Sequence, residues 1–197
     1  MDAQFALTGR DFAISVTDTN VLQSILKIKT NKDKTWQLTP YTMMSVTGEA
    51  GDIDPFAEYI QGNVKLYSVR NSQDLTPKEV ANFIRGELAT ALRSRGAYRV
   101  NVLVSGFDKV TGEPSIYWID YLAALTKVPY GAHGYTAMVL YAVLDREYKQ
   151  DITLEDGMAI VRKCIDAMQK RFLNQMSTFT IKVIDAQGTR EIDISEA

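Results

Sequence analysis

The sequence has little of what metal sites and disulfide scaffolds require, with one cysteine and one histidine among 197 residues. A single cysteine cannot form a disulfide within the chain, which excludes a secreted fold held together by such bridges. One histidine and one cysteine are too few ligands for a zinc site, and no carboxylates stand at the spacing of a metal-binding motif. We therefore expect neither a metal nor a cofactor.

Neither sign of charge dominates, since 22 lysines and arginines face 24 aspartates and glutamates and leave a formal net charge of −2. Proteins that bind duplex nucleic acid usually carry an excess of cations, which displaces the counterions of the phosphates. The balance of charge therefore argues against nucleic-acid binding.

Long apolar runs of the length that crosses a bilayer are also missing. Residues 1–5 lack the basic and apolar regions of a secretion signal. We expect no membrane association and a location in the cytoplasm and nucleus.

No linker rich in proline, glycine or serine divides the chain, and no low-complexity tract or internal repeat is present. The hydrophobic fraction of 46% and the length of 197 residues suit one domain with a substantial core. We expect residues 1–197 to form a single domain.

Alternation of apolar and polar side chains predicts strands in the first quarter of the chain. Phe12, Ile14 and Val16 alternate with smaller or polar residues after a turn signal at 9–11. Further strands are predicted over residues 24–29, 36–38 and 41–47.

Helical spacing follows, because apolar residues step by three and four over residues 53–67. The next helix is predicted to begin at a capping box of Thr76 and Glu79, with Pro77 in the first helical position. Gly96 is expected to take the left-handed conformation at its end.

The pattern then repeats, with a strand block, two helices and a closing hairpin. Pro129 and Gly131 are expected to end the strand block, and Thr153 with Asp156 resembles a second helix cap. The predicted strands are 100–104, 115–121, 122–128, 179–183 and 189–194, and the predicted helices are 137–148 and 158–172. If each helix pair covers one sheet, the order predicts a four-layer α/β/β/α sandwich.

Two isolated residues are candidates for chemistry. His133 would need a nucleophile and an orienting partner to act as a general base, so we favour a loop or helix-start residue that packs or hydrogen-bonds. Cys164 falls on an apolar helix stripe, which favours a buried small side chain over a reactive thiolate.

Two segments are candidates for anion binding. Residues 48–52, Gly-Glu-Ala-Gly-Asp, stand between a strand and a helix but lack the endings of phosphate-binding motifs, and their carboxylates would repel phosphate. We favour close packing of strand and helix there. Lys27, Lys29, Lys32 and Lys34 form a small basic cluster, which we interpret as a solvated strand end rather than an anion site.

Several separated blocks resemble the β-type subunits of the eukaryotic 20S proteasome. The resemblance runs from about Asp11 to the C-terminal hairpin, and it is carried by residues 48–52, 56–61, 100–108, 119–122 and 128–135. It implies the sandwich of the N-terminal nucleophile hydrolases and a place in the β rings of a barrel-shaped protease.

The resemblance does not by itself imply activity, because catalytic members expose a threonine whose hydroxyl attacks the peptide bond. In the register of the Gly48 block, that position falls on Asp2, while Asp18 and Lys34 land where the family's supporting aspartate and lysine stand. A carboxylate cannot replace the hydroxyl, and only Met1 precedes Asp2, which leaves little room for a propeptide. We assign no catalytic residue and leave open whether Asp18 and Lys34 keep a role.

An alternative is an active threonine-type hydrolase released by processing before Thr8. Leu7 precedes Thr8, whereas the family has glycine at its processing sites, and cleavage there would remove the predicted first strand. Residues 4–9 also lack the family's usual Leu-Gly pair.

The resemblance thus implies a non-catalytic structural subunit, without enzymatic activity of its own, that contributes to ring assembly and ubiquitin-dependent protein degradation. Its expected partners are other α and β subunits of the barrel. A third possibility, a free-standing domain that binds a small molecule, predicts a well-behaved monomer.

Overall fold

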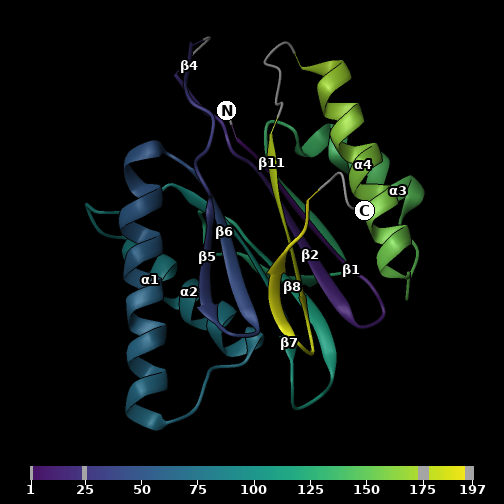
Figure 1. Cartoon of the computed structure of the whole chain (residues 1–197). Helices are drawn as coiled ribbons and strands as arrows, with labels where there is room; N and C mark the ends of the chain where they lie inside the picture. The colour runs from purple at the N-terminus through teal and green to yellow at the C-terminus, as the bar shows by residue number, and fades with distance from the viewer. Residues whose placement is uncertain (1, 24–25, 173–177, 194–197) are drawn as a thin grey trace.

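Two antiparallel sheets lie face to face between two pairs of helices (Figure 1). The computed structural model describes residues 2–23, 26–172 and 178–193. Within them, each main sheet has five strands, and a separate ribbon has two. Helices α3 and α4 cover one sheet and helices α1 and α2 cover the other, so the predicted four-layer α/β/β/α sandwich is confirmed.

The first sheet has the strand order β10-β1-β2-β11-β12. Its strands are β1 (Ala3–Thr8), β2 (Phe12–Asp18), β10 (Tyr130–Gly134), β11 (Phe179–Asp185) and β12 (Gly188–Glu191). The covering helices are α3 (Ala137–Glu147) and α4 (Leu154–Arg171). The turn predicted at 9–11 joins β1 to β2, where the Gly9 amide donates to the Phe12 carbonyl.

The second sheet has the order β5-β6-β7-β8-β9. Its strands are β5 (Thr35–Thr39), β6 (Thr42–Gly48), β7 (Val100–Asp108), β8 (Glu113–Ile119) and β9 (Leu125–Val128). The covering helices are α1 (Ala50–Asn71) and α2 (Pro77–Leu92).

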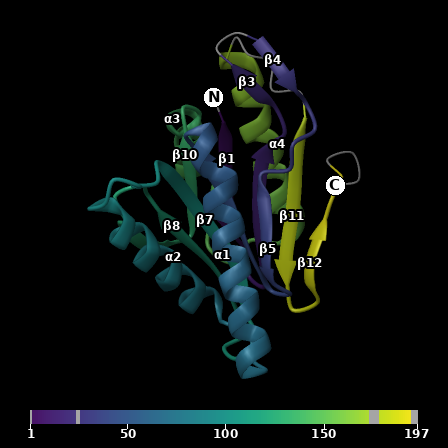
Figure 2. The ribbon, with the colours of Figure 1, turned by 90° about the vertical axis from the view of Figure 1, so that its left-hand side faces the viewer.

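The two-stranded ribbon consists of β3 (Val21–Gln23) and β4 (Leu26–Lys29). It stands at the same end of the sandwich as the start of β1 (Figure 2). The first two residues of the strand predicted over 24–29 lie outside the described residues, as does the last residue of the strand predicted over 189–194.

Strands β1, β2 and β6 bury both faces, and their alternate residues join different layers of the core. Phe12, Ile14 and Val16 of β2 join the core beneath α3 and α4, whereas Ala13 joins the layer between the sheets. That middle layer is partly polar, because Ser15 and Thr17 of β2 are buried in it. The hydrophobic effect therefore holds each helix pair to its sheet through large cores, with a smaller core between the sheets.

Helix starts agree with the predicted caps. Thr76 and Glu79 form the predicted capping box, in which the Thr76 amide donates to the Glu79 carboxylate over 2.8 Å. The Asp156 amide donates to the Thr153 hydroxyl at the start of α4. The predicted end at Gly96 is wrong, because α2 ends at Leu92 and Arg93 is its cap.

Two strand predictions in the third quarter are also wrong. The strand predicted over 122–128 begins at Leu125, because the Asp120 carboxylate accepts the amides of Leu122 and Ala124 and holds a turn. The strand block does not end at Pro129, since β10 follows and pairs with β1. The two glycines of β10 have low strand propensity, so only this pairing identifies it.

No helix in the described ranges is long and apolar enough to cross a membrane.

Candidate functional site

The side chain of Lys34 lies at the meeting point of three segments that are distant in sequence. Its ammonium donates to the Asp2 carboxylate over 2.7 Å, to the Asp18 carboxylate over 2.9 Å and to the Asn20 carbonyl over 2.8 Å. A lysine ammonium has three N–H donors. Each donor of Lys34 therefore has its own acceptor.

The β1–β2 hairpin brings the two carboxylates together. The antiparallel register pairs Gln4 with Thr17, so Ala3 lies beside Asp18 and Asp2 follows immediately. The Ala3 amide donates to the Asp18 carboxylate over 2.7 Å, and the Asn20 amide donates to its other oxygen over 3.1 Å. Asp18 is thus held by backbone groups as well as by Lys34.

Lys34 reaches this hairpin from the other sheet. It directly precedes β5, and the Val46 amide of β6 donates to its carbonyl. Its side chain is 4% exposed, that of Asp18 is fully buried and that of Asp2 is 19% exposed. The group therefore links the two sheets at one end of the middle layer.

The charges of this group do not balance, because two carboxylates face one ammonium. Burial raises the pKa of the Asp18 carboxyl above its usual value, while the charge of Lys34 and the Ala3 amide act in the opposite direction. The Asp2 charge adds to the raising effect. The sequence prediction that Asp18 and Lys34 stand next to position 2 agrees with this geometry.

A cavity of about 500 Å³ opens beside Asp2. It is lined by Asp2, Thr47, Gly48, Asn101, Gly134, Tyr135 and Met138. The Asp2 carboxylate in its wall only accepts hydrogen bonds when ionised, and it accepts one from Lys34. An ionised carboxylate in this position cannot supply the attacking hydroxyl that acyl transfer by a threonine requires.

Gly48, the first residue of the block at 48–52, lies where the backbone packs closely beside this cavity. A Cβ at Gly48 would lie 2.1 Å from the Arg99 carbonyl oxygen, and the φ of Gly48 is +150°. The Glu49 amide donates to the same carbonyl over 2.9 Å. The block therefore joins β6 to α1 by close backbone packing, as predicted, and its position does not indicate a phosphate site.

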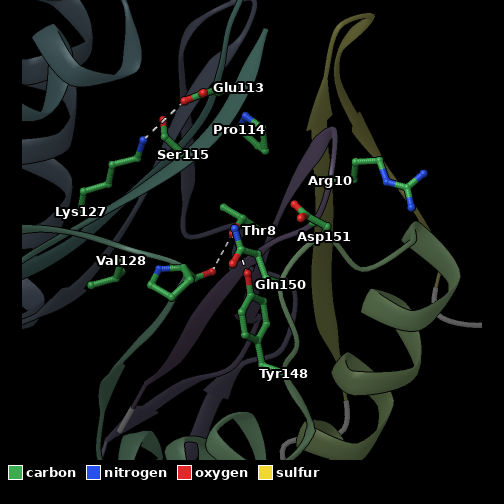
Figure 3. Close-up of a pocket in the computed structure, with 12 residues that line it drawn as sticks. Thr8, Arg10, Glu113, Pro114, Ser115, Lys127, Val128, Tyr148, Gln150 and Asp151 are labelled. Carbon is green, nitrogen blue, oxygen red and sulfur yellow. Dashed lines mark hydrogen bonds and ion pairs between the residues drawn. The ribbon is translucent and has the colours of Figure 1, made fainter. Parts of the chain in front are cut away.

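Thr8 lies at the opposite end of β1, about 20 Å from Asp2 at the usual rise of a strand. Its hydroxyl donates to the Pro129 carbonyl over 3.0 Å and lies 3.1 Å from the Tyr148 hydroxyl (Figure 3). The cavity in front of it, of about 690 Å³, also exposes charged residues such as Arg10 and Asp151. The Lys34 group is far from this threonine.

Processing before Thr8 would also remove the middle of a sheet. Strand β1 pairs with β10 on one side and with β2 on the other. Ala3, Phe5 and Leu7 of β1 are buried in the core beneath α3 and α4. The geometry does not favour the alternative of a hydrolase that begins at Thr8.

His133 lies on β10 between the sheets rather than in a loop or at a helix start. Its ring stacks on Trp118 with 4.6 Å between centroids, and its Nε2 lies 3.3 Å from the Val102 carbonyl oxygen. Burial lowers the pKa of His133 to about 4. The predicted role in packing and hydrogen bonding is confirmed, although the predicted element is wrong.

The other candidates divide between buried and exposed positions. Cys164 is buried and burial raises the pKa of its thiol to about 12, which agrees with the predicted apolar packing role. Lys27 and Lys29 are exposed on β4, and Lys32 pairs with Asp54 of α1 over 2.6 Å. The interpretation of the lysine cluster as a solvated strand end is wrong for Lys34, which is buried in the ion-pair group.

The backbone of Asn20 and Ala3 was not predicted to take part in this group. Main-chain amides and carbonyls leave no residue-type signal, so only the fold reveals them. In the described part of the chain, no set of three or more His, Cys, Asp or Glu residues is placed to hold a metal ion.

Comparison with known proteins agrees with the resemblance seen in the sequence. A family profile described as "Proteasome subunit" matches residues 3–184. The chain is 42% identical over 196 residues to the "Probable proteasome subunit beta type-4" of Neurospora crassa, covering 100% of this chain and 97% of that protein. It is 41% identical over 197 residues to the "Proteasome subunit beta type-4" of Saccharomyces cerevisiae, covering all of both chains.

A plant relative, the "Proteasome subunit beta type-2-A" of Arabidopsis thaliana, is 42% identical over 191 residues, which cover 97% of this chain and 93% of that protein. Among β-type subunits, the sequence blocks look most like the fourth, and the names of the two fungal relatives confirm that recognition. The match over residues 3–184, together with the N-terminal nucleophile hydrolase sandwich, shows that this chain belongs to the proteasome subunit family.

Proposed function

We propose that this chain is a non-catalytic structural β subunit of the 20S proteasome core particle. It contributes to assembly of the ring and thereby to ubiquitin-dependent protein degradation. The observation that carries the proposal is the hydrogen bond from Lys34 to Asp2. Where a catalytic member has its threonine, this chain has a carboxylate bound to the lysine, and the chain itself performs no catalysis.

The surface supports a subunit with several partners. Four large apolar side chains of α1 are exposed: Tyr59, Leu66, Tyr67 and Val69, the last at 71%. Met138 on α3 is 83% exposed. Such groups favour burial against other proteins, so the expected partners are neighbouring α and β subunits in a hetero-oligomeric barrel. We propose that residues 1–197 act as one domain within it, in the cytoplasm and nucleus.

Labelling of the purified particle with an electrophile directed at N-terminal hydroxyls tests the proposal. We expect the intact mass of this chain to show no adduct, while catalytic subunits of the same particle react and serve as the internal control. A chain whose mass begins at Thr8 and carries the adduct would overturn the proposal.

Size-exclusion chromatography of the isolated chain separates the structural subunit from a free-standing binding domain. A subunit with unsatisfied apolar surfaces is expected to aggregate or to form partial assemblies. A stable, monodisperse monomer would favour the binding domain instead.

A further inference from the structure

The side chain of Asp2 completes the set of acceptors around Lys34. Asp18 and the Asn20 carbonyl take two of its donors, and Asp2 takes the third. The lysine is 4% exposed, so little water reaches it to replace a lost acceptor. An uncharged residue without an acceptor at position 2 would leave a buried donor unpaired.

The two charged residues next to Lys34 in the sequence, Lys32 and Asp33, have partners of their own. Its neighbour Lys32 pairs with Asp54 of α1, and its neighbour Asp33 accepts from Lys182 of β11 over 2.6 Å. The Lys32 ammonium and the Asp33 carboxylate therefore form ion pairs with α1 and β11, respectively, rather than with Lys34's group. The ion-pair group consists of Asp2 from the start of β1, Asp18 from the end of β2 and Lys34 from the start of β5.

The backbone of residue 2 is confined as well. A Cβ at Gly134, the last residue of β10, would lie 2.3 Å from the Asp2 carbonyl oxygen. The chain at Asp2 is therefore held between β10 on its backbone side and Lys34 on its side-chain side. Both constraints act at the point where β1 enters the sheet beside the cavity.

We propose that Asp2 is a positioning residue whose carboxylate latches the start of β1 to Lys34. Asp18 and Lys34 then keep a role as the other half of the latch, and the ammonium is withheld from any ligand in the cavity. The latch shares the hydrogen bond between Lys34 and Asp2 with the proposed function, but its tests measure contacts within this chain rather than catalysis.

Hydrogen exchange of the peptide containing residues 3–8, measured by mass spectrometry on the assembled particle, tests the latch. Asp2→Asn keeps the shape but removes the charge, and Asp2→Ala removes both. Because hydrogen bonds between charged groups are roughly twice as strong as neutral ones, we expect exchange about tenfold faster for Asp2→Asn and faster still for Asp2→Ala. Asp166→Asn is the matched control, since it removes an exposed partner of Lys170 at the same distance of 2.7 Å.

Acylation of lysine amines gives a second readout that a space-filling role would not change. Lys34 acylation should rise from wild type to Asp2→Asn to Asp2→Ala. The control Asp166→Asn should change neither the acylation of Lys34 nor the hydrogen exchange of β1. Exchange and acylation within twofold of wild type in both Asp2 variants would overturn the proposal. So would an Asp2→Asn variant identical to wild type beside an affected Asp2→Ala variant, because shape alone would then suffice.

If an Asp2 variant does not assemble, the acylation of lysines in the wild-type particle still tests the latch. A paired, buried ammonium should react on the order of a hundredfold more slowly than the exposed Lys170. Equal acylation of the two lysines in wild type would show that Lys34 is not latched. The electrophile experiment on Thr8 is independent of these readouts, so failure of the latch and failure of the proposed function are distinguishable.

Discussion

The two ends of β1 differ in a way that decides how this chain is understood. At one end, Asp2 meets a buried lysine and a second carboxylate but has no hydroxyl. At the other end, Thr8 has a hydroxyl, but its partners are a carbonyl and a phenol. The buried lysine and the threonine hydroxyl therefore lie at opposite ends of one strand. A threonine alone does not indicate a threonine hydrolase.

Removal of the positive charge of Lys34, at the Asp2 end of β1, should have the largest effect. Lys34→Met leaves the carboxylates of Asp2 and Asp18 facing each other without a cation, and breaking a buried pair in this way costs about 3–5 kcal/mol. We expect failure to assemble or a much lower melting temperature of the particle. Lys170→Met is the control, since its pair is exposed and its loss should cost under about 1 kcal/mol. Equal melting temperatures for the two variants would contradict a structural role of the buried group.

Acid should weaken the layer between the sheets through His133. Its pKa falls from 6.5 to about 4 in the fold. A lowered histidine pKa means that its stabilising contribution is complete above about pH 6.5 and is lost as the pH falls toward 4, by about 3 kcal/mol in total.

His133→Phe isolates this effect in a pH series of thermal unfolding. Asp18, whose pKa is raised by burial, acts in the opposite sense, because its protonation favours the fold as the pH falls. The difference between wild type and His133→Phe removes that shared contribution. An identical pH dependence of both proteins would show that the imidazole is not held neutral by burial.

The close contact between the backbones of Gly48 and Arg99 beside the cavity should leave no room for a side chain at position 48. Gly48→Ala places a Cβ against the Arg99 carbonyl, and we expect destabilisation of about 1–3 kcal/mol. Gly86→Ala is the matched control within α2, where a Cβ would meet nothing within 4 Å. There the higher helix propensity of alanine should stabilise the chain by up to about 1 kcal/mol. Denaturation midpoints of the two variants should therefore move in opposite directions, and a shift of the same sign would refute the packing argument.

The Thr8 end should show the smallest effect. Thr8→Val keeps the shape of the side chain but removes the hydrogen bond to the Pro129 carbonyl, at a cost of about 1 kcal/mol. Peptide cleavage by the particle should be unchanged, with Thr8→Ser as the control that keeps the hydroxyl. Loss of one peptidase activity in Thr8→Val, with rescue in Thr8→Ser, would show that this hydroxyl takes part in catalysis.

Local patterns were sufficient for most of the elements. The alternation of Phe12, Ile14 and Val16 and the capping box at Thr76 depend on neighbours within a few residues, and both agree with the structure. The segment 130–134 has no such local signal, and it forms a strand only because β1 lies beside it. The turn at Asp120 was missed for a similar reason. One carboxylate oxygen of Asp120 accepts the amides of Leu122 and Ala124, and aspartate is too common on surfaces to signal such a turn.

The sequence by itself determined the layer order and, through the resemblance, which residues stand at the positions of a catalytic site. Periodicity reports which face of an element is apolar, and residue type reports whether a hydroxyl is available. Only the tertiary structure decided that Lys34 is buried with Asp2 and Asp18 and that Thr8 lies far from them. Those facts depend on the pairing of β1 with β2 and on the packing of one sheet against the other, which bring together residues 16 and 32 positions apart.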